Sequence, residues 1–459
     1  MKIIKSLIFI LCSILLFVSC KKDDPPLSAN QLNFESREQG LTAEANESEV
    51  KIFLSRTAET ALPVSIDLIP SGLTYGVEFT TLPEASSNRI DLTIAAGASS
   101  GSFKVTKKAG VFFSGTESIS FVIKGVPATA IAGDTDSSTV KFSAIVSTGS
   151  QLTLQGKTTA SNYANVIYVD LSNNQSTPVD RKSWNLGFSN GAMFRVILNQ
   201  SYQSTIKALA KTDINSVGLA DTAGVFLNHD INDPATVSLV DYWDGDLAKT
   251  AVAEISSTES SNKVYLLSFE GNKNGDQYYK LRLTRNGSGY KIQYAKVGET
   301  TIKELDVPKG ADTNFQFVSL ETNKTVQVEP KKQNWDIAWC YGTYNSGLGS
   351  PYWFQDLVLT NNIGGVKAAE VLETQFTYES FAELNIGSVT FSGTRDAIGS
   401  KWRQGAGPGG PGSIKHDRYY VVRDPQGNVY KLKFISWGGG GDAGERGKPV
   451  IEYKIVKKV

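Results

Sequence analysis

The sequence predicts an all-β protein, with a β-sandwich near the N-terminus and a longer β-domain that repeats itself. Three observations support this prediction. Apolar and polar residues alternate in short runs, Gly or polar turns separate these runs, and several pieces of the second half recur about 150 residues later. Alternation with a period of two is typical of strands that bury one face. Only residues 213–217, 366–374 and 377–384 have the composition of short helices.

The first unit covers residues 30–146. Its alternating runs lie at residues 50–54, 64–68, 90–94, 102–105 and 119–123. Short strands at this spacing are typical of a sandwich of two sheets. Small and polar residues at 147–150 then predict an exposed linker between two domains.

The second unit, residues 150–459, divides into halves at about 150–311 and 312–459. Four pieces recur: 167–174 parallels 316–323, 183–188 parallels 334–339, 279–283 parallels 430–434, and 292–294 parallels 451–453. The recurring pieces lie 149, 151, 151 and 159 residues apart. These nearly constant offsets indicate an internal duplication with changes in loop length.

The N-terminus predicts a cleaved signal peptide over residues 1–19. Lys2 and Lys5 precede an apolar run at 7–18, which is too short to span a bilayer core of about 30 Å. Small Ser19 before Cys20 resembles a bacterial lipobox, so we expect Cys20 to carry the lipid that holds the protein on a membrane. Residues 20–29 would form a tether. Within it, residues 22–24 resemble the export tag of Bacteroidetes surface lipoproteins, which implies the outer membrane and the cell surface.

Composition excludes several classes of function. Cleavage after residue 19 would leave 44 basic and 46 acidic residues, so there is no basic excess to bind nucleic acid. Cys340 would be the only other cysteine, which excludes an intramolecular disulfide and any zinc site that needs several thiolates. Only two histidines exist, and neither lies in a catalytic motif. We therefore predict that the protein is not an enzyme.

The first unit resembles Calx-beta domains. The matching pieces are residues 54–56, 76–79, 96–102 and 115–117. In that family clustered carboxylates bind calcium, which takes six to eight oxygen ligands. Here Glu78 and Glu117 match, with Asp134 and Asp136 near the end of the unit. The resemblance implies a structural spacer with few calcium ligands, and whether it binds calcium stays open.

The second unit resembles the HmuY family of haem-carrying lipoproteins. The matching pieces are residues 334–338, a Gly-Pro loop at 405–411, a hairpin at 419–434 and the closing run 451–455. They cover 312–459 well, and 150–311 weakly through the repeat. The resemblance implies an all-β surface protein that binds haem without catalysis and passes it to an outer-membrane transporter.

The haem ligands of the family do not carry over to this chain. Haem iron needs a His, Met, Cys or Tyr donor. The resemblance aligns one family histidine with Ala406 and the other near Cys340, which is not a family ligand. His416, ten residues after Ala406, is the best replacement donor. We interpret His229 as a surface residue in a polar loop and Met193 as a core residue.

Aromatic side chains offer a second candidate site. Rings are dense in a Gly-rich segment predicted as a loop, 341–354, and such rings suit a flat ligand, a sugar or a peptide. The candidate ligand-binding residues are Tyr341, Tyr344, Tyr352, Trp353, Trp402 and His416. Haem or a related tetrapyrrole is the first candidate ligand. A glycan, a peptide or another surface partner, with haem binding lost, is the alternative, and a purely structural stalk is the third. Residues 241–246 look calcium-like but lack the full motif, which predicts a solvated turn.

Overall fold

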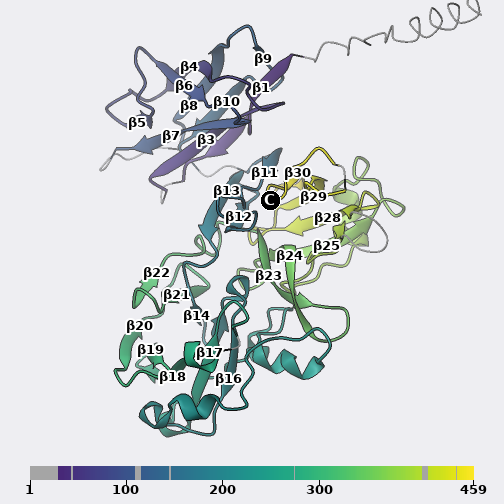
Figure 1. The fold of residues 1–459 in the computed structure, drawn as a ribbon. Coiled ribbons are helices and arrows are strands. Elements are labelled where there is room, and N and C mark those ends of the chain that lie inside the picture. The colour runs from purple at the N-terminus through teal and green to yellow at the C-terminus, as the bar shows by residue number, and fades with distance from the viewer. Residues whose placement is uncertain are drawn as a thin grey trace, which may run out of the picture.

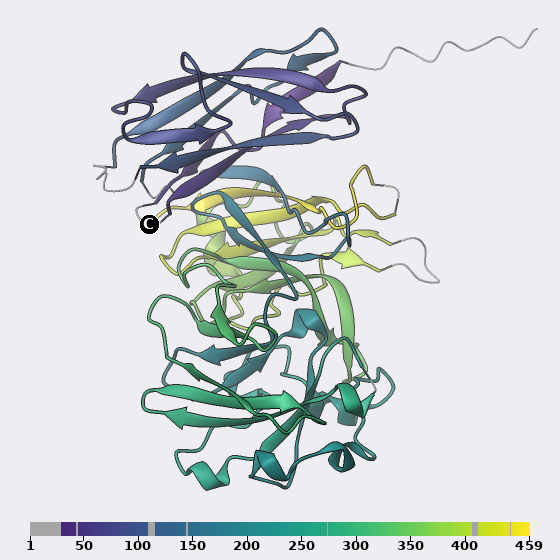
Figure 2. The ribbon, with the colours of Figure 1, turned by 60° about the vertical axis from the view of Figure 1, so that its left-hand side comes forward.

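The structure is a computed structural model that describes residues 29–42, 45–108, 115–143, 146–272, 274–405, 412–440 and 442–459. The predicted all-β class is confirmed, because strands dominate and the helices in this part of the chain are short 3-10 turns. The predicted signal peptide, Cys20 and Ala406 lie outside the described residues. Within those ranges, no helix combines the length and apolar character that a bilayer crossing requires. Figures 1 and 2 show a β-sandwich at one end and a larger β-body beside it.

The N-terminal sandwich consists of two five-stranded sheets, with strand orders β5-β7-β3-β1-β9 and β2-β10-β8-β4-β6. Its strands are β1 (Asn30–Phe34), β2 (Glu38–Gly40), β3 (Glu47–Leu54), β4 (Leu62–Ser71), β5 (Phe79–Leu82), β6 (Arg89–Ile94), β7 (Ser100–Lys107), β8 (Ser118–Gly125), β9 (Ala130–Ala132) and β10 (Ser137–Lys141). Each predicted alternating run falls within one of them. Alternate side chains of β3 and β8 enter the core, where the Phe103 and Phe121 ring centroids lie 4.8 Å apart.

The larger body contains four main sheets, which we name by their position. Outer sheet I is β11-β30-β29-β28-β25, inner sheet I is β13-β12-β23-β24, inner sheet II is β15-β14-β21-β22, and outer sheet II is β16-β17-β18-β19-β20. The first-half strands are β11 (Gly149–Thr153), β12 (Asn165–Asp170), β13 (Gln175–Asp180), β14 (Leu186–Ser189), β15 (Val196–Leu198), β16 (Thr205–Ala208), β17 (Val264–Ser268), β18 (Tyr279–Asn286), β19 (Gly289–Lys296) and β20 (Lys303–Val307). The second-half strands are β21 (Phe315–Ser319), β22 (Lys324–Val326), β23 (Ile337–Asn345), β24 (Pro351–Thr360), β25 (Lys367–Leu372), β28 (Arg418–Arg423), β29 (Val429–Ser436) and β30 (Val450–Lys457), with a small ribbon of β26 (Arg403–Gln404) and β27 (Ser413–Ile414).

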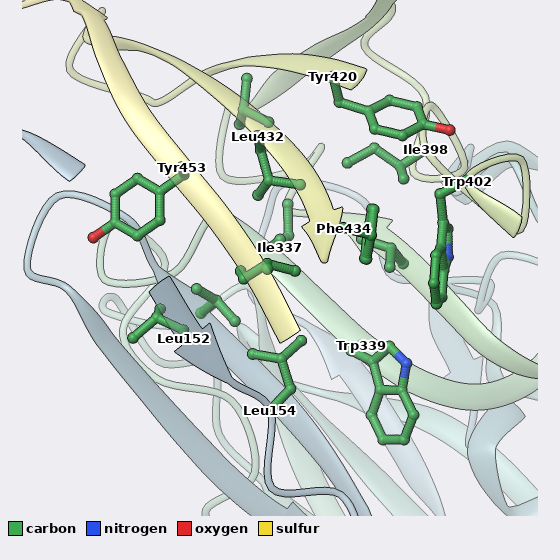
Figure 3. Packing of buried hydrophobic residues seen from close by; sticks show 14 of the residues in the cluster. Leu152, Leu154, Ile337, Trp339, Ile398, Trp402, Tyr420, Leu432, Phe434 and Tyr453 are labelled. Atoms are coloured by element: carbon green, nitrogen blue, oxygen red, sulfur yellow. The ribbon is translucent and has the colours of Figure 1, made fainter. Parts of the chain in front are cut away.

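These sheets stack as four layers around three apolar cores. Along β12, Ile167 and Val169 pack toward outer sheet I, whereas Val166 and Tyr168 pack toward inner sheet II. Figure 3 shows the first of these cores. A third core lies between inner sheet II and outer sheet II. The inner strands are therefore buried on both faces. A sequence pattern that alternates between apolar and polar residues identifies only strands with one buried face.

The two halves exchange strands, and corresponding strands occupy corresponding places. The first-half strand β12 pairs with β23 of the second half, and β14 pairs with β21. β11, which precedes β12 at the start of the first half, pairs with β30 at the end of the second half, whereas β20, which precedes β21, pairs with β19. The predicted duplication is confirmed, and each inner sheet contains strands from both halves.

Two side chains fasten this exchange at equivalent positions. Asn185 Oδ1 accepts a hydrogen bond from the backbone N–H of Leu320 at 2.7 Å. Asp336 Oδ2 accepts one from the N–H of Leu171 at 2.8 Å. Each residue follows a recurring tryptophan, and each bonds the backbone of the other half. We call these contacts the two clasps.

Two local predictions are wrong. Residues 366–374 do not form a helix, because β25 extends outer sheet I by pairing with β28, and this pairing outweighs the helix-forming composition. The segment 147–150 is not an exposed linker: Ser147 is buried and accepts a hydrogen bond from the Tyr453 hydroxyl, and β11 begins at Gly149. The domain boundaries themselves stay a prediction.

Candidate functional site

The aromatic segment of the second half forms a hairpin. Residues 341–354 were expected to be a loop, but β23 and β24 occupy most of them and only 346–350 connect the strands. Strand alternation separates the predicted ligand-binding rings onto two faces. Tyr341 and Trp353 share one face, whereas Tyr344 and Tyr352 both contact Phe354 on the other.

Tyr341 and Trp353 form the centre of an aromatic stack. Their ring centroids lie 4.1 Å apart with planes 13° apart. Tyr163 joins the stack, with its centroid 5.2 Å from that of Tyr341. The Arg181 guanidinium lies 5.4 Å from the Trp353 ring centroid. Tyr341 and Trp353 are each half-buried, so the stack packs against the protein and also leaves part of its surface exposed.

Two other predicted ligand-binding residues lie elsewhere. Trp402 is 1% exposed, stacks on Phe434 with centroids 4.0 Å apart, and donates from Nε1 to the Asp356 carbonyl oxygen. Figure 3 shows it inside the packed cluster beside Phe434. His416 is exposed in the turn that precedes β28. Neither residue lines the cavities described next.

A cavity of about 360 Å³ lies where the 228–231 loop meets the start of β24. It is lined by Gln203, Asn228, His229, Asp230, Ile231, Pro351, Tyr352 and Trp353. The Ser350 hydroxyl donates to the Ile231 carbonyl oxygen and fastens the loop to the hairpin. We call this space the hairpin cavity. It joins the first half of the duplication to the second.

His229 is the unexpected residue in this cavity. Only 9% of it is exposed, so its interpretation as a surface residue is wrong. Neither ring nitrogen has a hydrogen-bond partner within the described ranges. Burial lowers the pKa of His229 and thereby favours the neutral ring. A neutral imidazole with a free nitrogen is the form that binds a metal ion.

Exposed apolar side chains surround the opening of the hairpin cavity. Tyr352 is 46% exposed and Ile231 36%, and both line the cavity. Leu348, which is 66% exposed, lies in the turn between β23 and β24, four residues before Tyr352 in the chain. Apolar residues that gather at the rim of a concave site are typical of ligand-binding surfaces.

A second cavity of about 110 Å³ lies between the two inner sheets. Tyr168, Trp184, Phe317 and Trp335 line it, together with Cys340, which is buried as expected. Small-molecule sites usually hold about 300–1,000 Å³. The hairpin cavity falls within that range, and this central cavity is too small for a ligand of haem size.

Two further predictions about single residues are wrong. The prediction of a solvated turn at 241–246 holds for the exposed Asp246 but is wrong for Asp241, which is 5% exposed and accepts hydrogen bonds from the N–H groups of Leu198 and Ala251. Met193 is not a core residue, because 42% of it is exposed. In the part of the chain that the structure describes, no three His, Cys, Asp or Glu side chains gather as a set that could hold a metal ion.

Comparison with known proteins gives one extensive match. The sequence model of a family described as HmuY protein matches residues 162–298 and 311–453, which correspond to the two halves of the duplication. No curated protein matches the chain.

Solved structures resemble parts of the chain only distantly. The apo form of the Calx CBD1 domain is 14% identical, covers 25% of this chain and 97% of its own, and has a TM-score of 0.22. Apo PinO from Porphyromonas gingivitis is 15% identical over 39% of this chain and 97% of its own, with a TM-score of 0.15. A two-domain protein of unknown function from Bacteroides fragilis is 12% identical over 65% of this chain and 86% of its own, with a TM-score of 0.20.

Proposed function

The chain belongs to the HmuY family, and we propose on that premise that it binds haem or a related tetrapyrrole at the cell surface without catalysis. HmuY proteins bind haem as a family. The finer proposal for this chain is the place of binding, which we assign to the hairpin cavity. The proposed iron donor there, His229, lies at neither of the two positions that the family resemblance indicates, Ala406 and the neighbourhood of Cys340.

The observation that carries this proposal is the buried, unpartnered ring of His229. An imidazole that loses its hydrogen bonds to water without gaining others costs free energy, roughly 1–3 kcal/mol for each unpaired polar group. A ligand whose iron binds a ring nitrogen would recover that free energy. Histidine is a common axial donor to haem iron.

The rest of the cavity combines an apolar side, which suits the face of a flat ligand, with the polar side chains of Gln203, Asn228 and Asp230. Trp353 and Pro351 provide apolar walls, and the exposed Tyr352 ring lies at the opening. The Tyr352 hydroxyl is a second possible donor, because tyrosine also binds haem iron. When bound, the iron would supply the coordination bond, while the surrounding residues orient the ring and exclude water.

A hemin titration followed by visible absorption tests the proposal. The wild type is compared with His229→Ala and with the matched control His416→Ala. The two substitutions remove the only two histidines of the chain. We expect His229→Ala to weaken hemin binding at least about tenfold, which corresponds to a loss of about 1.4 kcal/mol in binding free energy. The variant should also shift the Soret band. His416→Ala should leave the spectrum unchanged.

Two results would contradict the assignment. Equal binding by wild type and His229→Ala would exclude this cavity as the haem site. If only His416→Ala weakens hemin binding and changes the Soret band, the haem site lies at the turn before β28 instead. A wild-type protein that leaves the Soret band of free hemin unchanged but binds a glycan or peptide would support the alternative ligand class.

The proposal includes attachment to the outer membrane through a lipid on Cys20, with the N-terminal sandwich as a spacer. The lipobox resemblance and the family support it. Cys20→Ser should release the protein into the aqueous phase in detergent partitioning. Retention of that variant in the detergent phase would contradict the lipid anchor.

A further inference from the structure

The central cavity is framed by four aromatic rings in a pseudo-symmetric arrangement. Tyr168 and Phe317 are equivalent in the duplication, as are Trp184 and Trp335. Tyr168 packs edge-to-face on Trp335 with centroids 5.0 Å apart and planes at 79°. Phe317 packs on Trp184 with centroids 4.7 Å apart and planes at 75°. Each pair joins one half of the chain to the other, and all four rings line the same space.

Polar atoms in the same wall lack partners. Asn314 is 5% exposed, and its Oδ1 has no hydrogen bond within the described ranges. Trp335 is 8% exposed, and its Nε1 is also unpartnered there. Buried polar atoms are usually paired, so unpaired ones in a cavity wall are available to bind water or a ligand. An aromatic cavity with an unpaired carbonyl oxygen offers an acceptor to a ligand.

Acidic side chains outnumber basic ones around the cavity, and burial raises the pKa of Glu329 to about 7 and that of Asp241 to about 6. Glu329 is 3% exposed and Asp241 5%, and Asp246 adds an exposed carboxylate at the rim. Arg395 is the cationic side chain among the lining residues. Glu329 Oε1 accepts hydrogen bonds from the N–H groups of Asn314 and Phe315. Its Oε2 has one contact, a long 3.5 Å approach from Asn314 Nδ2, and so retains acceptor capacity.

We propose that the central cavity binds a small organic cation, an alkylated ammonium group, between the four aromatic rings and the Glu329 carboxylate. The faces of aromatic rings attract cations, and cages of Trp and Tyr are well suited to quaternary ammonium groups. The excess of carboxylates over guanidinium disfavours an anion. This site is separate from the hairpin cavity and does not depend on hemin binding there.

The size of the cavity limits the ligand. An apolar cavity of about 150 Å³ is sufficient for benzene. The central cavity, at about 110 Å³, therefore accommodates a compact head group rather than a whole metabolite. Ile363 and Asp246 lie at exposed positions of the lining, so a longer ligand could leave its tail outside. Each half contributes two of the four rings, so the proposed site exists only when the two halves are assembled.

Binding of tetramethylammonium to the full chain tests the proposal, with tert-butanol as a neutral probe of similar size. We expect saturable heat in isothermal titration calorimetry and a change in tryptophan fluorescence with tetramethylammonium. Binding of tert-butanol should be at least about tenfold weaker, since it lacks the charge. Equal binding of the two probes would mean that the cavity selects apolar volume only. An absence of binding by tetramethylammonium would overturn the proposal.

Glu329→Gln isolates the role of the carboxylate. The Gln oxygen can still accept from the Asn314 and Phe315 N–H groups, as Glu329 Oε1 does, so the fold should persist. We expect about tenfold weaker binding of tetramethylammonium, against no change in the matched variant Glu59→Gln, which alters an exposed residue of the N-terminal sandwich. Unchanged affinity in Glu329→Gln would contradict the proposal.

Trp335→Phe provides an independent test of the cage. The substitution removes an Nε1 that has no partner in the described chain and replaces the ring that attracts cations best. We expect weaker tetramethylammonium binding and little change for tert-butanol. A parallel loss for both probes would contradict a cation-selective cage.

Discussion

The two halves of the duplication have the same strand order, but they differ at their clasps. In the first half a neutral amide, Asn185, accepts from the Leu320 N–H. In the second half a carboxylate, Asp336, accepts from the Leu171 N–H. Both side chains are almost fully buried. The geometry of the clasp therefore requires an acceptor oxygen at this position and does not require a charge.

The charge at Asp336 has a cost that the amide avoids. Burial first, and then the neighbouring Asp170 carboxylate, raises the pKa of Asp336 well above its usual range. Asp170 is itself 6% exposed and accepts from the Asn173 backbone and side chain. The Asp336 clasp thus brings two buried carboxyl groups together, Asp170 from the first half and Asp336 from the second, whereas the other clasp has the amide of Asn185.

The halves also differ in the hairpin that follows each clasp. In the first half β14 and β15 have four and three residues, whereas β23 and β24 have nine and ten. The additional length carries Tyr352 and Trp353 to the hairpin cavity, and Tyr341 stacks on Trp353. Duplication therefore gave a symmetric body, and extension of one hairpin produced the asymmetric site.

The largest effect should come from separating the halves. A fragment of residues 154–298 and one of 311–459 would each lack strands of both inner sheets, because β12 pairs with β23 and β14 with β21. We expect neither fragment alone to show cooperative unfolding or dispersed NMR signals. Co-expression should restore a folded complex. A fragment that folds by itself would show that the exchange is dispensable.

Asn185→Asp should cause the next largest effect. The substitution preserves an acceptor for Leu320 but adds a carboxylate at a site that is 2% exposed. We expect a loss of roughly 3 kcal/mol in the free energy of unfolding at pH 7.5, since an uncompensated buried charge is strongly destabilising. Urea denaturation should show a smaller loss at pH 5, where the new carboxyl can bind a proton. A pH-independent loss would point to a packing effect instead.

Asp336→Asn should have the smallest effect, and in the opposite direction. Because the pKa of Asp336 is higher in the folded state, its stabilising contribution is complete below the unfolded value of about 3.9 and is lost as pH rises through the folded value. The amide keeps an acceptor for Leu171 and can donate toward Asp170. We expect a gain of about 1–2 kcal/mol at pH 7.5 that shrinks as pH falls. Urea denaturation from pH 5 to 8 measures it, and a loss at every pH would contradict this account.

Much of the fold could be predicted because local patterns determine it. Alternation at 50–54 and 119–123 marks strands of an ordinary sandwich, and Trp184 and Trp335 mark the duplication. The exchange could not be predicted, since equal spacing of two motifs does not tell which strand pairs with which. Residues 366–374 were misread because Ala and Glu favour helices where pairing with a neighbouring strand decides the outcome.

The candidate site was only partly accessible from the sequence. The rings at 341–354 were found, but their division between two faces depends on strand alternation and on a bulge between Cys340 and Gly342. His229 lies more than a hundred residues before the hairpin, and its polar neighbours indicate a surface loop. Its burial depends on contact between distant segments, for which the local sequence contains no signal.

The pairing of β11 with β30 also affects the order in which the protein can assemble during synthesis. β11 ends at Thr153 and β30 begins at Val450, so the ribosome adds about 300 residues between them. At about 5–20 residues per second, this takes roughly 15–60 s. During that time β11 is without its partner strand, and an unpaired edge invites pairing with other chains. Completion of outer sheet I is thus a late step, set by the arrival of the last strand of the chain.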